Sequence, residues 1–183
     1  MTRLVSYQIT NLAQANMVTP FDPAMVNPAS LTVRLSDIFG LLIERAGNPE
    51  MVRYSLHGHD EDNPYLLVPG QLVAARLLER FSLPPTIEAQ MPFMIWENGL
   101  QVGTTVYPPG SGTGYWKVVI KNNSQLHPIP LWPGMCIGKV FFTELARSRG
   151  YSVNASLSTA GFLADDKKSH NPKHDPSRPC QRQ

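Results

Sequence analysis

Two runs of residues have the types and spacing that a chemical site would need. The first, His57-Gly58-His59-Asp60-Glu61-Asp62, places two imidazoles and three carboxylates side by side, as a metal site would. The run lacks cysteine and any recognisable set of supporting residues, so its composition favours a solvated turn over a metal centre. We therefore predict no metal ligands here.

The second run, Gly110-Ser111-Gly112-Thr113-Gly114, has the glycine content of a phosphate-binding loop. No lysine-serine or lysine-threonine pair follows it, and no apolar helix begins there. We interpret it as a flexible hairpin loop. No Gly-x-Ser-x-Gly motif precedes a helix either. The sequence therefore predicts neither a bound cofactor nor a serine nucleophile.

The elements that would position such residues are short strands. Leu31, Val33 and Leu35 alternate with polar residues, which indicates a half-buried strand. Turns are predicted at Pro69-Gly70 and Asn98-Gly99. Further strands are predicted over residues 65–68, 72–78, 86–96, 100–106, 115–121 and 136–142.

The remaining segments are a helix, an insert and a tail. Ser6 is predicted to be the N-cap of a short helix over residues 7–16. Residues 44–64 are polar and are interpreted as an exposed loop or a hairpin insert. From residue 165 the composition becomes polar and contains proline, so we predict a β domain over residues 1–164 and a tail over residues 165–183.

Composition agrees with one β domain. The 183 residues are 42% hydrophobic and 16% charged, which is enough to bury one sizeable core. Seventeen prolines and thirteen glycines suit many short strands joined by turns. The predicted fold is all-β, a double-sheet barrel or jelly roll with a short N-terminal helix.

Charge and hydropathy exclude several classes of partner. The formal net charge of +2 is too small to indicate binding to nucleic acid or to an anionic membrane. No segment approaches the ~18 consecutive apolar residues of a membrane span. The N-terminus is too polar for a signal peptide. We therefore expect a soluble intracellular protein without membrane or nucleic-acid partners.

Several short motifs occur in a characteristic order. They are Pro20-Phe21-Asp22-Pro23, residues 26–35 (VNPASLTVRL), residues 67–71 (LVPGQ), residues 77–84 (LLERFSLP) and residues 131–141 (LWPGMCIGKVF). In this order and at these spacings the chain resembles the dCTP deaminase branch of the trimeric dUTPase superfamily, from Ser6 to Tyr151. The resemblance implies a dUTPase-like fold and a homotrimer with active sites between subunits.

The resemblance also implies a position for the catalytic base. The family carries a glutamate in a Leu-Glu-x-x-Asn strand, where it activates the water that attacks the pyrimidine. Counting back from Pro133-Gly134-Met135 places that glutamate at Ile120, and a shift of one residue places it at Val119. Neither alkyl side chain can accept a proton. The sequence therefore predicts no catalytic residue at this position.

Two further parts of the family's site are missing. The family binds the triphosphate with a Gly-Arg-Ser-Ser-Leu-Ala-Arg segment, whereas residues 90–100 here contain neither arginine nor serine. Related dUTPases use an aspartate in the turn where this chain has Pro108. Tyr151 matches the first tyrosine of the family's closing segment, but residues 152–163 hold no matching lysine or second tyrosine.

These observations predict a catalytically inactive, trimeric structural or interaction protein, one candidate being a capsid decoration protein of a virus. It would then reside in the cytoplasm or in the virion. The alternatives are a nucleotide-binding regulator, or an active dCTP deaminase or dUTP diphosphatase of pyrimidine deoxynucleotide metabolism. In the interaction hypothesis the tail contacts a partner through its cations, Lys167, Lys168, Lys173, Arg178 and Arg182.

Overall fold

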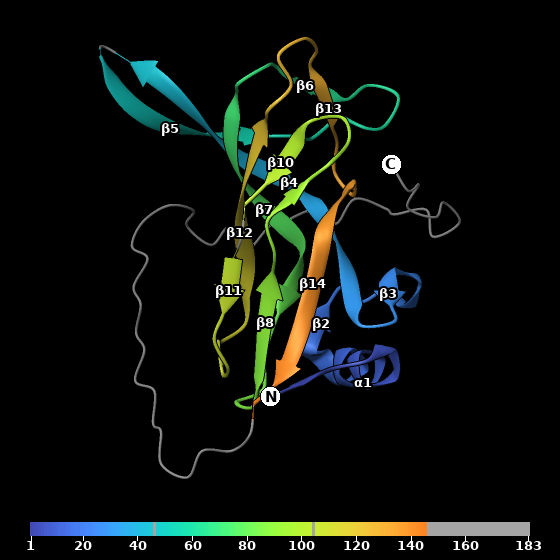
Figure 1. Cartoon of the computed structure of the whole chain (residues 1–183). Coiled ribbons are helices and arrows are strands. Elements are labelled where there is room, and N and C mark those ends of the chain that lie inside the picture. The colour runs from blue at the N-terminus through green and yellow to red at the C-terminus, as the bar shows by residue number, and fades with distance from the viewer. Residues whose placement is uncertain (46, 104, 146–183) are drawn as a thin grey trace.

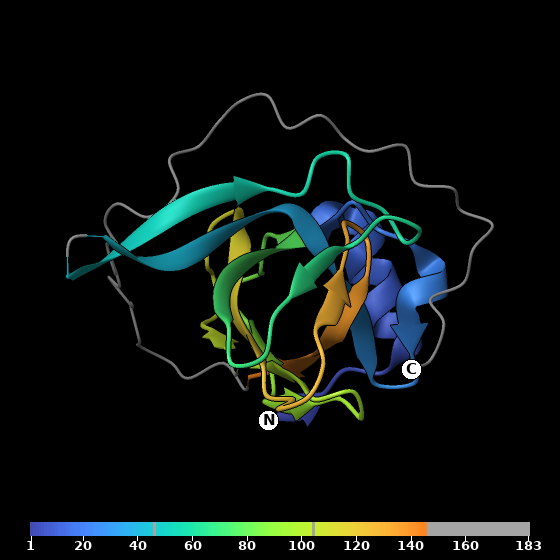
Figure 2. The same cartoon turned by 90° about the horizontal axis from the view of Figure 1, so that it is seen from above.

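The computed structural model describes residues 1–45, 47–103 and 105–145, and strands dominate them. Twelve strands form one curled antiparallel sheet, and two more form a separate pair (Figure 1). Seen from above, the strands wrap around a common interior (Figure 2). The predicted all-β fold with a short helix is confirmed. The strands are β1 (Thr2–Arg3), β2 (Val18–Thr19), β3 (Val26–Asn27), β4 (Ser30–Arg45), β5 (Asn48–Ser55), β6 (Tyr65–Leu67), β7 (Leu72–Phe81), β8 (Ile87–Met91), β9 (Met94–Ile95), β10 (Leu100–Val102), β11 (Thr105–Tyr107), β12 (Gly114–Asn122), β13 (Ile129–Leu131) and β14 (Cys136–Glu144).

The main sheet runs in the order β11-β8-β14-β4-β7-β12-β10-β9. Its central strands alternate between buried and more exposed side chains, because successive residues of a strand point to opposite faces. Trp116 on β12 stacks between Phe81 of β7 and Tyr107 of β11, with ring centroids 4.2 and 4.1 Å away. These aromatic contacts join three strands at one end of the core.

Strand β4 is longer than predicted and belongs to two parts of the molecule. Residues 31–34 of β4 pair with β14, and β7 pairs with β4 from Leu35 to Leu41. The last residues of β4 pair only with β5 among the described strands. Figures 1 and 2 show this β4–β5 hairpin extending away from the rest of the sheet. The hairpin interpretation of the insert is therefore confirmed as far as Ser55, where β5 ends.

The N-terminal helix differs from the prediction at both ends. Helix α1 covers Ser6–Leu12 and continues into a π-helical turn over Ala13–Met17. Ser6 is its first residue and not the N-cap. The cap position is Val5, whose backbone N–H donates to the Oε1 atom of Gln8 at 3.1 Å. The Ser6 N–H donates to the Pro28 carbonyl, which attaches the helix to the β3–β4 turn.

Two predicted strands are interrupted. The strand expected over residues 86–96 is split into β8 and β9 around Pro92, which has no backbone N–H to donate. The strand expected over residues 100–106 is split into β10 and β11 around Gly103, whose N–H donates to the Val119 carbonyl at 2.8 Å. A shorter 3-10 helix covers Pro23–Met25.

The Asn98-Gly99 turn is present as predicted, and it allows a test of the fold. Gly99 has a φ of 87°, and a Cβ atom there would lie 2.9 Å from the backbone nitrogen of Ser124. We expect Gly99→Ala to lower the free energy of unfolding by about 1–3 kcal/mol, because it adds backbone strain to a steric clash.

Chemical denaturation of the Gly99→Ala protein would measure this loss. The matched control is Gly112→Ala. A Cβ atom at Gly112 meets nothing within 4 Å, and the backbone of Gly112 does not have the positive φ that strains other residues. Equal stability of the two variants would contradict the turn geometry.

The predicted tail over residues 165–183, with its five cations, lies outside the described residues, as does Tyr151. Its role and the boundary at residue 165 stay predictions. Among the described residues, no helix has the length and apolar character that a membrane crossing requires.

Candidate functional site

The position expected for the catalytic base lies in the hydrophobic core. Ile120 on β12 is fully buried, with 0% of its surface exposed. Its neighbours across the two adjacent strands are Val73 on β7 and Val102 on β10, which are also fully buried. An aliphatic side chain between two valines provides no proton acceptor and no contact with water. This position cannot activate a water molecule.

A register shift of one residue does not supply a base either. Val119 is 45% exposed and belongs to the opposite face of β12, because side chains alternate along the strand. Its backbone carbonyl accepts the N–H of Gly103, and its side chain is apolar. Both positions considered from the sequence are therefore apolar, one inside the core and one on the surface.

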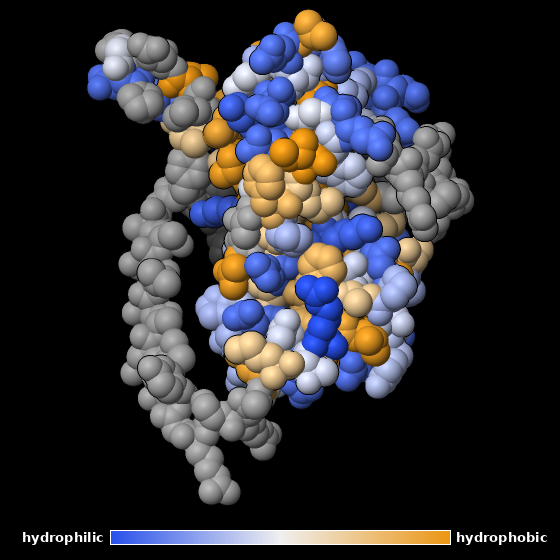
Figure 3. All heavy atoms as spheres, in the orientation of Figure 1, coloured by the Kyte–Doolittle hydropathy of each residue, from blue (hydrophilic) through white to orange (hydrophobic). Residues whose placement is uncertain are grey.

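Residues 90–100, where the sequence resemblance places the family's arginine- and serine-containing segment, include exposed apolar side chains. Phe93 is 49% exposed and Ile95 is 60% exposed. Figure 3 shows hydrophobic residues gathered among hydrophilic ones around the place where Figure 1 draws β10, the neighbour of β9. The charged side chain of this segment is Glu97, an anion that would repel phosphate. The segment therefore lacks the cationic donors that a triphosphate requires.

The glycine-rich run connects two strands, but it does not close the predicted hairpin. It joins β11, which pairs with β8, to β12, which pairs with β7 and β10. The hairpin part of the interpretation is therefore wrong, because the two strands joined by the loop are not neighbours in the sheet. The N–H of Gly110 donates to the carbonyl of Pro84 at 3.1 Å. A strand and not a helix follows the loop, so no helix N-terminus faces an anion there. Pro108, which the sequence resemblance places in the turn of the dUTPase aspartate, is exposed.

The histidine-rich run forms a turn whose side chains bond within the protein. The two ring nitrogens of His59 lie 3.3 Å from the Tyr54 hydroxyl and 3.1 Å from the Asn63 carbonyl. A carboxylate oxygen of Asp60 accepts the backbone N–H groups of Asp62 and Asn63. Within the described residues, no group of three or more His, Cys, Asp and Glu side chains is placed to hold a metal ion.

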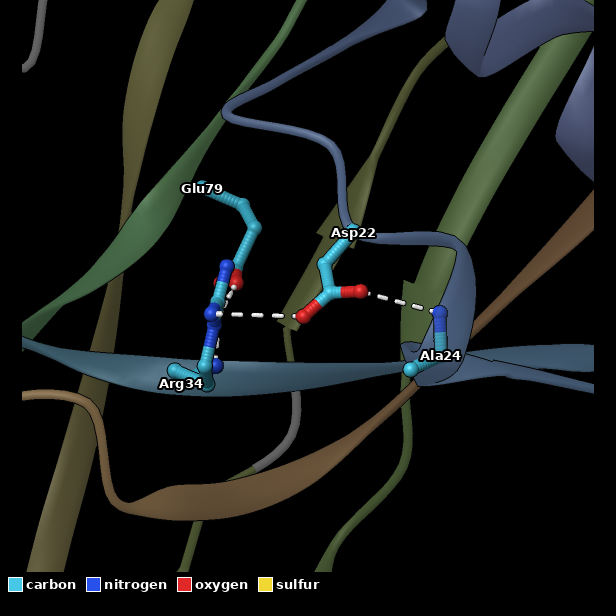
Figure 4. A network of polar contacts seen from close by, with 4 residues as sticks. All are labelled: Asp22, Ala24, Arg34 and Glu79. Atoms are coloured by element: carbon cyan, nitrogen blue, oxygen red, sulfur yellow. Dashed lines mark hydrogen bonds and ion pairs between the residues drawn. The ribbon is translucent and has the colours of Figure 1, made fainter. Parts of the chain in front are cut away.

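A buried ion pair is one polar feature that was not predicted from the sequence (Figure 4). The Nε atom of Arg34 on β4 lies 2.7 Å from Oε1 of Glu79 on β7, and the Arg34 backbone N–H donates to the other carboxylate oxygen at 2.9 Å. A carboxylate oxygen of Asp22 lies 3.9 Å from the guanidinium. Arg34 was expected on the polar face of its strand, but its side chain is only 4% exposed.

The environment of Glu79 explains this pairing. Burial raises the pKa of its carboxyl above the ordinary value, and the Arg34 guanidinium opposes that rise. Both carboxylate oxygens accept hydrogen bonds from Arg34, and the side chain is 3% exposed. A carboxylate held in this way stabilises the β4–β7 contact and is closed to substrate. The LLERF motif contains Glu79, but a partner 45 residues away gives no local signal.

Comparison with known proteins agrees with these motifs. The model of the dCTP deaminase-like family matches residues 4–145. A protein of Pseudarthrobacter chlorophenolicus named "dCTP deaminase, dUMP-forming" is 33% identical over 148 residues, which cover 74% of this chain and 75% of that protein. A protein of the same name from Beutenbergia cavernae is 35% identical over 139 residues, covering 69% and 70%.

The fold is also found among solved structures. The 2'-deoxycytidine 5'-triphosphate deaminase from Agrobacterium tumefaciens superposes with a TM-score of 0.61 at 18% identity. The match covers 77% of this chain and 48% of the Agrobacterium chain. At 18% identity this likeness shows the fold alone. The family model and the relatives named above align with most of the sequence of this chain. The chain therefore belongs to the dCTP deaminase-like family.

Proposed function

We propose that this chain is a dCTP deaminase-like protein that does not deaminate by the family's mechanism and acts as a homotrimeric structural or interaction protein. The observation that supports this most is Ile120, fully buried between two buried valines at the position expected for the base. Deamination of cytosine by water needs a titratable group within hydrogen-bond reach of that water. Without it, the reaction loses its general acid-base contribution, typically about 10²–10⁴-fold.

The surface of residues 90–100 supports the same proposal. A triphosphate brings several negative charges, which proteins usually meet with arginine or lysine donors. Exposed Phe93 and Ile95 and the anionic Glu97 offer no such donor. Large exposed apolar side chains suit contact with another protein surface better than contact with phosphate.

The second candidate function is active deamination of dCTP, and the relatives favour it. Proteins named "dCTP deaminase, dUMP-forming" align with 69–74% of this chain at 33–35% identity. An active enzyme would require a base other than the side chains at positions 119 and 120. Product analysis with dCTP separates the two candidates, because only the second forms a deaminated nucleotide. A nucleotide-binding regulator would bind dCTP and leave it unchanged.

The capsid-decoration hypothesis and the choice between cytoplasm and virion stay predictions. They depend on the tail over residues 165–183, which lies outside the described residues. The relatives compared above are named as deaminases and carry no capsid role in their names.

The proposed trimer gives a direct prediction. The sequence led us to expect that some of Val118, Ile120, Phe93, Ile95 and Trp96 fill the family's site or the subunit contact. In the structure Val118 and Ile120 are buried within one chain, and Trp96 is partly buried against the same core. Phe93 and Ile95 are the exposed members of this set and are left for the contact. We expect light scattering to report about three chains per particle.

The double variant Phe93→Ser and Ile95→Ser is expected to shift this equilibrium toward monomers, since burying each side chain contributes about 1.5–3 kcal/mol. The matched control is Leu126→Ser, because Leu126 is 88% exposed on a different loop. A wild-type protein that is monomeric at micromolar concentration would contradict the trimer. A double variant that remains trimeric would place the contact elsewhere.

A further inference from the structure

Three cationic side chains cluster on the outer face of β7 and β12. Side chains alternate along both strands. Leu77 and Glu79 of β7 and Trp116 of β12 face the core, and the neighbouring positions of each strand face outward. Outward-facing Tyr115 pairs with Arg80, and Lys117 pairs with Arg76. We call Arg76, Arg80 and Lys117 the cationic cluster.

An irregularity in the strand pairing creates this cluster. Between the two pairs β7 advances four residues while β12 advances only two. Arg76 and Arg80 therefore flank a single tyrosine. The guanidinium carbon (Cζ) of Arg76 lies 4.3 Å from the centroid of the Tyr115 ring, and that of Arg80 lies 4.8 Å from it. These cation-π contacts hold the two guanidinium groups in place.

The charges of the cluster are unmatched within the described part of the chain. Arg76 is only 8% exposed, and its buried Nε atom has no hydrogen-bond partner. No ion pair joins Arg76, Arg80 or Lys117 to a carboxylate of the described residues. A buried charged donor without a partner is costly, and native proteins rarely leave one. Cationic hydrogen-bond donors that lack a carboxylate partner are the groups that an anion-binding site requires.

We propose that the cationic cluster binds a phosphate or polyphosphate group of a small ligand. Guanidinium forks match the oxygen geometry of phosphate, and Lys117 adds a third positive charge beside them. A small ligand fits better than nucleic acid for two reasons. Two guanidinium groups already lie over the Tyr115 ring and would compete with a base for stacking on it. The net charge of the chain is also only +2.

This site is separate from Ile120, which is buried in the core on the face of β12 opposite Tyr115 and Lys117. The other position expected for the catalytic base, Val119, shares the outward face of Tyr115 and Lys117 but has an apolar side chain that binds no anion. Because the cationic cluster includes neither of these two residues, anion binding does not depend on whether the protein deaminates dCTP. The two proposals can fail independently of each other.

The test is calorimetric titration of the full-length protein with sodium tripolyphosphate and with inorganic phosphate, at low salt and at physiological salt. We expect saturable binding of tripolyphosphate that weakens about tenfold or more in Arg80→Gln and in Lys117→Gln, since each change removes a charge-assisted contact. Both residues are exposed, so these variants should fold normally. Lys139→Gln is the matched control, because Lys139 is exposed on β14 and lies outside the cluster.

Tyr115 provides a second pair of variants. Tyr115→Phe keeps the ring under both guanidinium groups and should bind as the wild type does. Tyr115→Leu keeps all three cations but loses the ring, so binding should weaken while the circular dichroism spectrum stays unchanged. Equal affinities of these two variants would overturn the role assigned to the ring.

Three outcomes would overturn the site itself. The first is that the wild type does not bind tripolyphosphate, and the second is that Lys139→Gln weakens the affinity as much as Arg80→Gln and Lys117→Gln do. The third is that the protein binds a single-stranded oligonucleotide or anionic lipid vesicles and that tripolyphosphate does not displace them. The last outcome would assign these cations to a macromolecular polyanion.

Discussion

Replacing Glu79 with alanine is expected to lower the free energy of unfolding by about 3–5 kcal/mol, the usual cost of removing one member of a buried ion pair. The remaining guanidinium of Arg34 would stay in the protein interior, where its side chain is 4% exposed. Its nearest compensating charge would then be Asp22, 3.9 Å away and partly exposed. The Arg34 backbone N–H would also lose its acceptor. Urea denaturation measures the loss.

Two controls make this prediction specific. Glu144→Ala removes an exposed carboxylate from the end of β14 and should change stability by no more than about 0.5 kcal/mol. The double variant Arg34→Met and Glu79→Leu removes both charges and should be less destabilised than Glu79→Ala, because no uncompensated charge remains. A Glu79→Ala protein as stable as Glu144→Ala would show that the pair contributes little to the fold.

Much of the sheet could be predicted from local sequence patterns. The alternation of Leu31, Val33 and Leu35 identified β4, and all three side chains are fully or almost fully buried. The Asn98-Gly99 turn was predicted from residues that favour a positive φ, and Gly99 has one. Such signals are local, since a strand's period and a turn's backbone depend on neighbouring residues.

The features that were missed depend on long-range contacts. Alternation along β4 suggested that Arg34 faces solvent, whereas Glu79 from β7 neutralises it inside the protein. Pro92 was predicted within a continuous strand, but its missing N–H interrupts the pairing. The short strands β1, β2, β3 and β13 were not predicted either, because two or three residues carry no period.

For the functional residues, too, local sequence patterns predicted one part and long-range contacts decided the other. Motif spacing alone led to position 120, and the structure adds that its side chain is enclosed by Val73 and Val102. The cationic cluster was not predicted from the sequence. Arg76 and Arg80 come from one strand and Lys117 from another, and only the irregular pairing brings them together around Tyr115.

An assay for nucleotide products tests most directly whether this chain lacks the family's activity. Purified protein would be incubated with dCTP and with dUTP, with and without magnesium, and the nucleotides separated by chromatography. The Pseudarthrobacter chlorophenolicus protein named "dCTP deaminase, dUMP-forming" serves as the parallel control. We expect no dUTP or dUMP to form from dCTP, and no dUMP to form from dUTP, above the background without protein, because the side chains of Ile120, Val119 and Pro108 cannot accept a proton. A turnover of about one per second, which is ordinary for enzymes, would contradict the proposal.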